Sequence, residues 1–259
     1  MTDAHTPKPK IAFFDFTSCE GCQLTVLDSL QTHPELLDVV EIVEFREALT
    51  GHAERYDIAF IEGSCTRPSD EERLTSIRAR ASVVVALGAC AHIAGINAIR
   101  NNMPLAEVRN IVYGDDANRF DTYPARPIHA VIAVDYSIPG CPINPDEFLR
   151  IVTVLLQGRS PELPDYPVCI ECKLRETVCV YQRGRTCLGP ITRAGCEAIC
   201  PARGYECVGC RGLTSNPNLE SLDQVMAEYG LKPDAIQSRL DMFLSWELQD
   251  RRAKEVNRE

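Results

Sequence analysis

Short apolar runs alternate with amphipathic segments along the first 156 residues of the chain. The runs are rich in aromatic and β-branched residues, which favour strands. Ser82–Leu87 (SVVVAL) is apolar without interruption, as is typical of a strand buried on both faces of a parallel sheet. The pattern predicts five strands, at residues 10–16, 39–45, 57–61, 82–87 and 129–134.

Helices are expected between these strands. Leu24, Leu27 and Leu30 recur at helical spacing, and Ser69 followed by Glu72 has the spacing of a capping box. Further helices are expected at residues 69–80, 92–100, 105–111 and 146–156, and from Pro233 to about Ala253. The alternation predicts an α/β fold, with a flavodoxin-like, doubly wound parallel sheet over residues 1–158 and a strand order that stays open.

Five cysteines follow expected strands directly. Cys19 and Cys22 follow the first strand, Cys65 the third, Cys90 the fourth and Cys141 the fifth. The carboxyl ends of parallel strands meet at one edge of the sheet, where ligands bind near the switch point in strand order. Thiols from distant parts of the chain are therefore expected at one rim of the sheet. Buried cysteines without a shared role would not be expected to gather at the same edge.

The other eight cysteines lie between Cys169 and Cys210, with the spacing C-x2-C-x6-C-x7-C-x8-C-x3-C-x6-C-x2-C. This stretch has little alternating or helical apolar pattern, so a group bound to the sulfurs is expected to order it. Residues 158–167 hold three prolines and are interpreted as a linker. Residues 159–259 are expected to form a cysteine-rich second domain with C-terminal helices.

Three kinds of group could occupy these sulfurs. Disulfides need an oxidising compartment, but the polar N-terminus MTDAHTPKPK has neither an apolar signal segment nor a twin-arginine pair. The chain is therefore expected in the cytoplasm, with metal on its thiols. Zinc and iron-sulfur clusters both use four cysteine thiolates, so the local spacing leaves these two open.

Composition limits the other classes of function. The apolar content of 45% and charged content of 25% are ordinary for a soluble globular protein, and no apolar run approaches the roughly 18 to 20 residues needed to cross a bilayer. The net charge of −10 repels phosphate backbones. Neither a membrane span nor a nucleic-acid partner is expected.

Five segments carry a resemblance to a known family. They are TSCEGCQ (17–23), EGS (62–64), GACA (88–91), PGCP (139–142) and CLGPITRAGC...CP...CVGCRG (187–212). In this order they resemble the small, electron-transfer subunit of nickel-iron hydrogenases across nearly the whole chain. VCIEC and CLGPITRAGC look most like the sulfhydrogenase delta subunit, in the cytosolic, bidirectional NAD(P)-linked branch.

The resemblance implies three [4Fe-4S] clusters. The implied ligands are Cys19, Cys22, Cys90 and Cys141 for a proximal cluster, Cys196, Cys200, Cys207 and Cys210 for a medial cluster, and Cys169, Cys172, Cys179 and Cys187 for a distal cluster. Cys169 replaces a histidine of the periplasmic members, and Cys200 supplies a fourth thiolate where many of them hold a three-iron cluster. Of thirteen cysteines, Cys65 is left over. One-electron carriers gain from a line of three sites, whereas zinc does not, so the resemblance favours iron-sulfur.

The resemblance also implies partners. Hydrogen would be split at the nickel-iron site of a separate large subunit, and electrons would pass through this chain to a flavin (FAD)-containing diaphorase with further iron-sulfur subunits, which reduces NAD(P). This chain would carry no catalytic residue of its own. The alternatives are a heterodisulfide-reductase-linked or deazaflavin-reducing hydrogenase and, from another class, a zinc-stabilised interaction module.

Three further residues have more than one interpretation. Glu62 could act near the proximal cluster or bond loop amides, because a buried carboxylate needs a partner. His92 is expected to be partly exposed at the start of a helix. Trp246 is expected to anchor a core or an interface.

Overall fold

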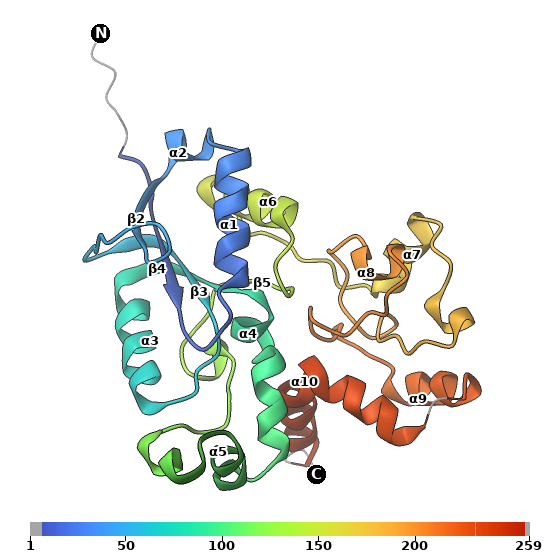
Figure 1. Ribbon diagram of the computed structural model, residues 1–259. Coiled ribbons are helices and arrows are strands. Elements are labelled where there is room, and N and C mark those ends of the chain that lie inside the picture. The colour runs from blue at the N-terminus through green and yellow to red at the C-terminus, as the bar shows by residue number, and fades with distance from the viewer. Residues whose placement is uncertain (1–6, 231, 257–259) are drawn as a thin grey trace.

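The computed structural model describes residues 7–230 and 232–256. Its centre is a five-stranded sheet in the order β2-β1-β3-β4-β5, and every neighbouring pair of strands is parallel (Figure 1). The strands are β1 (Lys10–Asp15), β2 (Glu41–Phe45), β3 (Tyr56–Glu62), β4 (Ala81–Leu87) and β5 (Tyr136–Ile138). This is the flavodoxin order, so the predicted fold class is confirmed.

Helices cover both faces of the sheet. Phe13 of β1 packs on one face with Val26 of α1 and Phe148 of α6, whereas Phe14 packs on the other face with Leu74 of α3. The helices and 3₁₀ turns of this part are α1 (Gly21–Thr32), α2 (Leu36–Val39), α3 (Pro68–Arg80), α4 (Gly88–Ile93), η1 (Gly95–Asn102), α5 (Leu105–Tyr113), η2 (Gly114–Arg119), η3 (Ile128–Ala130) and α6 (Pro145–Leu156). Because successive strand residues point to opposite faces, the aromatic run of β1 supplies both core layers.

The fifth strand was predicted too early in the chain. Residues 129–134 form a 3₁₀ turn and loop, and the strand begins at Tyr136. Ile128 and Ile132 are buried in the core beside β4, which explains the apolar pattern without a strand. The Asp135 carboxylate accepts a hydrogen bond from the backbone N–H of Val84 at 2.7 Å and so fixes where pairing starts.

Two helices also differ from expectation. The predicted capping box of Ser69 and Glu72 does not form, because α3 begins one residue earlier, at Pro68, whose fixed φ suits the first helical position. Asp70 accepts from the backbone N–H of Thr66 at 2.9 Å instead. The helix expected at 92–100 is divided at Ala94, which has a φ of 61° and separates α4 from η1.

The cysteine-rich part has little regular structure but does have a core. Its short helical elements are α7 (Val168–Leu174), η4 (Val180–Arg183) and α8 (Ile199–Ala202), followed by the longer α9 (Leu219–Glu228) and α10 (Pro233–Val256). Leu188 and Ile191 are buried against Phe243 and Leu244 of α10. The expectation that bound groups alone would order this stretch was incomplete, since the helices that follow it supply an apolar surface.

Helix α10 also packs against α4 and η1, so it touches both parts of the chain (Figure 1). The side chain of Asn102 in η1 donates to the hydroxyl of Ser245 in α10 at 2.9 Å. Trp246 packs against Ala94, Ala98 and Ala125, which confirms it as a core anchor. Of the helices in residues 7–230 and 232–256, not one is both long and apolar enough to cross a membrane.

Candidate metal centres

The first thiol group, defined as Cys19, Cys22, Cys90 and Cys141, lies at the carboxyl edge of the sheet. Burial is the main cause that raises the pKa of Cys90 to about 12, and the charges of Cys141 and Cys19 contribute to the same shift. Burial likewise raises the pKa of Cys22, with contributions from Cys141 and Cys90. Loops after β1, β4 and β5 thus bring four thiols together, as the sequence predicted.

Glycines let these loops approach closely. Gly88 follows β4 with a φ of +82°, and a Cβ there would collide with the sulfur of Cys22. The backbone N–H of Ala89 donates to the carbonyl of Gly140 at 2.7 Å, which joins the loops after β4 and β5. The edge is therefore held by backbone bonds as well as by side chains.

Glu62 bonds loop amides, which was one of its two expected roles. Its carboxylate accepts from the backbone N–H groups of Cys22 at 3.2 Å and Gln23 at 3.1 Å. These are donors at the start of α1 that have no partner within the helix. Burial raises the pKa of Glu62, and these two bonds lower it. The carboxylate therefore fixes the helix start that carries Cys22.

Cys65 lies apart from the first thiol group although it follows β3. It is fully buried, and its sulfur is 2.9 Å from the hydroxyl of Tyr123. Tyr123 donates in turn to Glu71 at 2.8 Å. Burial raises the pKa of Cys65, and the neighbours that modify it are Tyr123, Asp70, Arg126 and Glu71. The surplus thiol belongs to a separate polar network.

Replacement of Cys65 by serine is expected to leave the metal content of the protein unchanged. The hydroxyl keeps a hydrogen-bonding partner for Tyr123, and the first thiol group loses nothing. Iron analysis of the anaerobically purified variant checks this. Loss of one cluster's worth of iron would show that Cys65 is a ligand.

The second thiol group, Cys196, Cys200, Cys207 and Cys210, lines a cavity of about 350 Å³ that Cys141 of the first group also reaches. Burial, followed by the charge of Cys196, raises the pKa of Cys210 to about 12. A hydrogen bond from the backbone N–H of Cys141 lowers it. The first two groups therefore meet where Cys141 faces Cys210.

The third thiol group is Cys169, Cys172, Cys179 and Cys187. Helix α7 carries Cys169 and Cys172 three residues apart, which places them on one helix face. Burial raises the pKa of Cys169 to about 12, followed by the charges of Cys187, Cys172 and Cys179. A Cβ at Gly189 would lie 3.4 Å from the sulfurs of both Cys169 and Cys187, so glycine leaves room beside them.

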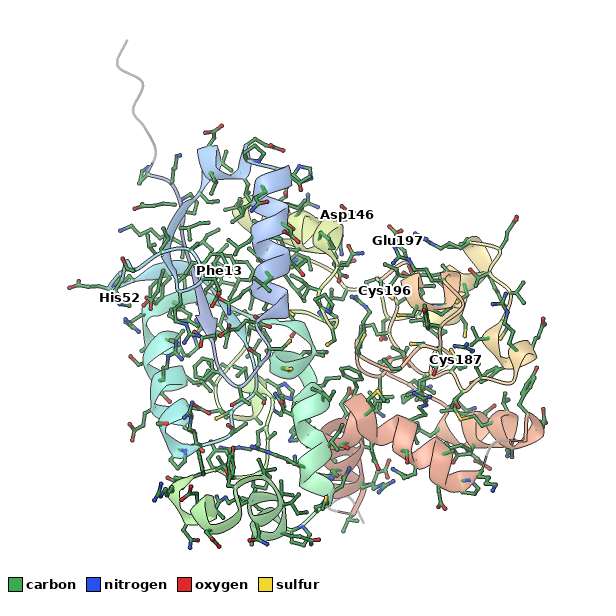
Figure 2. The ribbon with its side chains drawn as sticks, viewed as in Figure 1. Phe13, His52, Asp146, Cys187, Cys196 and Glu197 are labelled. Atoms are coloured by element: carbon green, nitrogen blue, oxygen red, sulfur yellow. The ribbon has the colours of Figure 1, made fainter. Side chains whose placement is uncertain are left out.

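The second and third groups are also adjacent. The backbone N–H of Cys207 donates to the sulfur of Cys187 at 3.3 Å, and the charge of Cys196 raises the pKa of Cys172. Figure 2 shows Cys187 and Cys196 on neighbouring loops of the cysteine-rich part. The second group therefore adjoins the first at Cys141 and Cys210, and the third at Cys207 and Cys187.

The donor sets fit clusters that take four thiolates. Within residues 7–230 and 232–256, no three histidine, cysteine, aspartate or glutamate side chains stand close enough to share a single metal ion. The pKa values of ten of these twelve thiols are raised, with burial as the first cause. These residues would hold such a cluster in their thiolate forms, so the thiol protons would be released when it binds.

Sequence reasoning missed two carboxylates and an arginine beside these groups. Glu171, between Cys169 and Cys172, accepts from the backbone N–H groups of Gly195 at 2.7 Å and Ala198 at 2.9 Å, so α7 supports the loop around Cys196. Glu147 and Arg211 form a buried pair. A charged residue within an otherwise apolar cysteine motif is the signal that could have identified Glu171 and Arg211.

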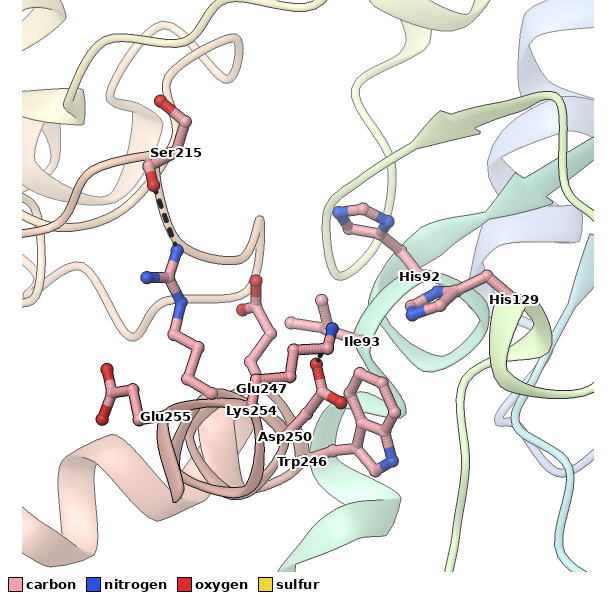
Figure 3. A pocket seen from close by; sticks show the side chains of 10 residues that line it. His92, Ile93, His129, Ser215, Trp246, Glu247, Asp250, Lys254 and Glu255 are labelled. Atoms are coloured by element: carbon pink, nitrogen blue, oxygen red, sulfur yellow. Dashed lines mark hydrogen bonds and ion pairs between the residues drawn. The ribbon is translucent and has the colours of Figure 1, made fainter. Parts of the chain in front are cut away.

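A separate pocket of about 450 Å³ lies between α10 and the loops near His92 (Figure 3). His92 is partly exposed, as predicted, but it lies in the last turn of α4. Burial and the charge of His129 lower its pKa to about 3. His129 packs edge-on against Trp246, with ring centroids 5.1 Å apart. The two histidine rings therefore pack beside α10, and we assign neither of them to a thiol group.

Comparisons with known proteins agree with this geometry. Residues 19–155 match the family described as NADH ubiquinone oxidoreductase, 20 Kd subunit. The chain is 35% identical over 239 residues to sulfhydrogenase 2 subunit delta of Pyrococcus furiosus, covering 92% of this chain and 100% of that one. It is 32% identical over 251 residues to a subunit of the F420-non-reducing hydrogenase vhu of Methanococcus voltae, covering 84% and 85% of the two chains.

A solved structure is similar as well. The chain matches a crystal structure of an NAD⁺-reducing [NiFe]-hydrogenase in the H2-reduced state with a TM-score of 0.56 and 28% identity. The match covers 61% of this chain and 96% of that one.

Proposed function

The chain belongs to the NADH ubiquinone oxidoreductase 20 Kd subunit family and is a nickel-iron hydrogenase subunit. We propose that it relays electrons between a hydrogen-activating large subunit and a flavin-linked partner. The observation that carries the proposal is the adjacency of the four-thiol groups, the first with the second and the second with the third. The first group would hold the proximal cluster, the second the medial cluster and the third the distal cluster.

Each [4Fe-4S] cluster would supply one-electron transfer when bound. The residues of this chain hold, space and shield the clusters. Glu62 and Gly88 shape the loops of the first group, and Glu171 braces the loop of Cys196. The proposal assigns the nickel-iron site to the large subunit and FAD to a diaphorase partner.

The electron acceptor we propose is NAD(P), reached through the diaphorase and its iron-sulfur subunits in the cytoplasm. The solved relative is described as NAD⁺-reducing, which supports this. The second candidate is a heterodisulfide-reductase-linked or deazaflavin-reducing hydrogenase. The Methanococcus voltae relative is named F420-non-reducing, and because F420 is a deazaflavin, this similarity favours the heterodisulfide-linked form over the deazaflavin-reducing one. A zinc-stabilised interaction module stays the alternative from another class.

Anaerobic purification of the native complex tests the proposal. We expect about twelve iron and about twelve sulfide per chain, as three cubanes require, together with a large subunit and a flavoprotein. Hydrogen-dependent reduction of NAD or NADP separates the two hydrogenase candidates. Stoichiometric zinc without sulfide, or a chain that purifies without a large subunit, contradicts the proposal.

A further inference from the structure

Arg211 is buried at 1% relative exposure and directly follows Cys210. Its guanidinium donates from Nη1 and Nη2 to the two carboxylate oxygens of Glu147, at 2.7 and 2.9 Å. It also donates from Nη1 to the carbonyl of Pro139 at 2.8 Å, and from Nε to the carbonyl of Ala194 at 2.8 Å. All three nitrogens of the fork are bonded, and Glu147 is itself 4% exposed.

These partners come from both parts of the chain. Pro139 precedes Cys141 of the first thiol group by two residues, and Glu147 lies on α6 behind the same loop. Ala194 precedes Cys196 of the second thiol group by two residues. Arg211 therefore ties one loop of the first group to two loops of the second.

The surroundings of Arg211 fit this side chain closely. Gly195 has a φ of +113°, and a Cβ at that position would collide with Nη2 of Arg211. Burial of a charge pair costs desolvation, and apolar replacements of such pairs are often neutral or stabilising. The free energy of folding therefore does not explain why the Arg211 guanidinium makes four directional hydrogen bonds between the first and second thiol groups.

We propose that Arg211, paired with Glu147, is a positioning residue that fixes the proximal and medial clusters relative to one another. The proposal rests on the proposed relay function. The four hydrogen bonds of the guanidinium would set the distance that one electron crosses, without any proton or bond change. Outer-shell partners of this kind orient and tune metal ligands.

The test uses the complete anaerobic complex. The double variant Arg211→Met/Glu147→Gln removes the pair without leaving a buried charge unpaired. We expect its three clusters to assemble and the magnetic interaction between the reduced proximal and medial clusters to change in EPR. Electron output from hydrogen should drop by between about 10-fold and 100-fold. Arg211→Lys should not restore the magnetic interaction, because an ammonium lacks the planar, two-pronged donor geometry of a guanidinium.

Arg193→Met is the matched control. This arginine lies on the same loop but donates to the carbonyl of Pro164 at 3.0 Å and pairs with Asp165, so it does not reach the loop of Cys141. We expect its EPR interaction and iron content to equal those of the unaltered complex. Unchanged values in the double variant, or equal changes in the control, would overturn the proposal.

If the double variant does not fold, Glu147→Asp keeps the charge and shortens the reach by one methylene. In this variant we expect the magnetic interaction between the clusters to change while the iron content stays the same. An unchanged magnetic interaction would contradict the inference. A complex that lacks iron or the large subunit would count against the relay function instead, so the two failures are distinguishable.

Discussion

Cys90→Ala is expected to stop electron output from hydrogen while the large subunit still activates it. The first thiol group would hold the cluster next to the large subunit, so removal of one of its thiolates would break that cluster. Changes in outer-shell partners alone cost about 10-fold to 100-fold, so loss of a ligand should reduce dye or NAD(P) reduction by more than about 100-fold. Isotope exchange between hydrogen and solvent protons, which needs no electron to leave, should persist in the same sample.

The structure makes this variant a clean one. Position 90 lies within α4 between Ala89 and Ala91, both buried, and alanine is a favourable helix residue. Cys65→Ser is the matched control, since Cys65 follows the neighbouring strand β3 but lies in the network of Tyr123. Full electron output together with full iron content in Cys90→Ala would remove Cys90 from the proximal ligands.

Cys200→Pro is expected to convert the medial cluster to a three-iron form. Without the fourth thiolate, the corner iron is held only by sulfides and is lost. The remaining cluster has fewer negative ligands, so its potential should rise. EPR of the anaerobically purified, oxidised protein checks this, since an oxidised three-iron cluster is paramagnetic and an oxidised cubane of this type is silent.

Proline can be accommodated at position 200. The residue is exposed and lies in the first turn of α8, where a backbone N–H has no helical partner to lose. Its carbonyl, which proline keeps, accepts from the N–H groups of Arg203 at 3.0 Å and Tyr205 at 2.9 Å. Cys200→Ser serves as a control for the backbone change, because it removes the thiolate without adding a ring. If neither variant gives a three-iron signal and the other cluster signals are unaltered, Cys200 is not a medial ligand.

The sequence alone determined the parallel sheet and the rim on which Cys19, Cys22, Cys90 and Cys141 gather. Strand periodicity is a local property, and parallel strands place their carboxyl ends at one edge whatever their order. Spacing and resemblance together also divided the remaining cysteines into two sets, and the structure brings each of those sets together. Their assignment as ligands stays a prediction.

The strand predicted at residues 129–134 was wrong because its apolar residues are buried for another reason. Ile128 and Ile132 are buried from a 3₁₀ turn and the loop after it, and an apolar run of that length does not distinguish this from a strand. The start of β5 depends on Asp135, whose partner Val84 is 51 residues away in the chain.

Only the tertiary structure decided which polar groups meet. It separated Cys65 from the other rim thiols, gave Glu62 its two amide donors, and joined Arg211 to Glu147 across 64 residues. Hydrogen bonds and ion pairs depend on distances of about 3 Å between side chains. Such distances are set by how the loops pack against the sheet and α10, and no periodicity along the chain records them.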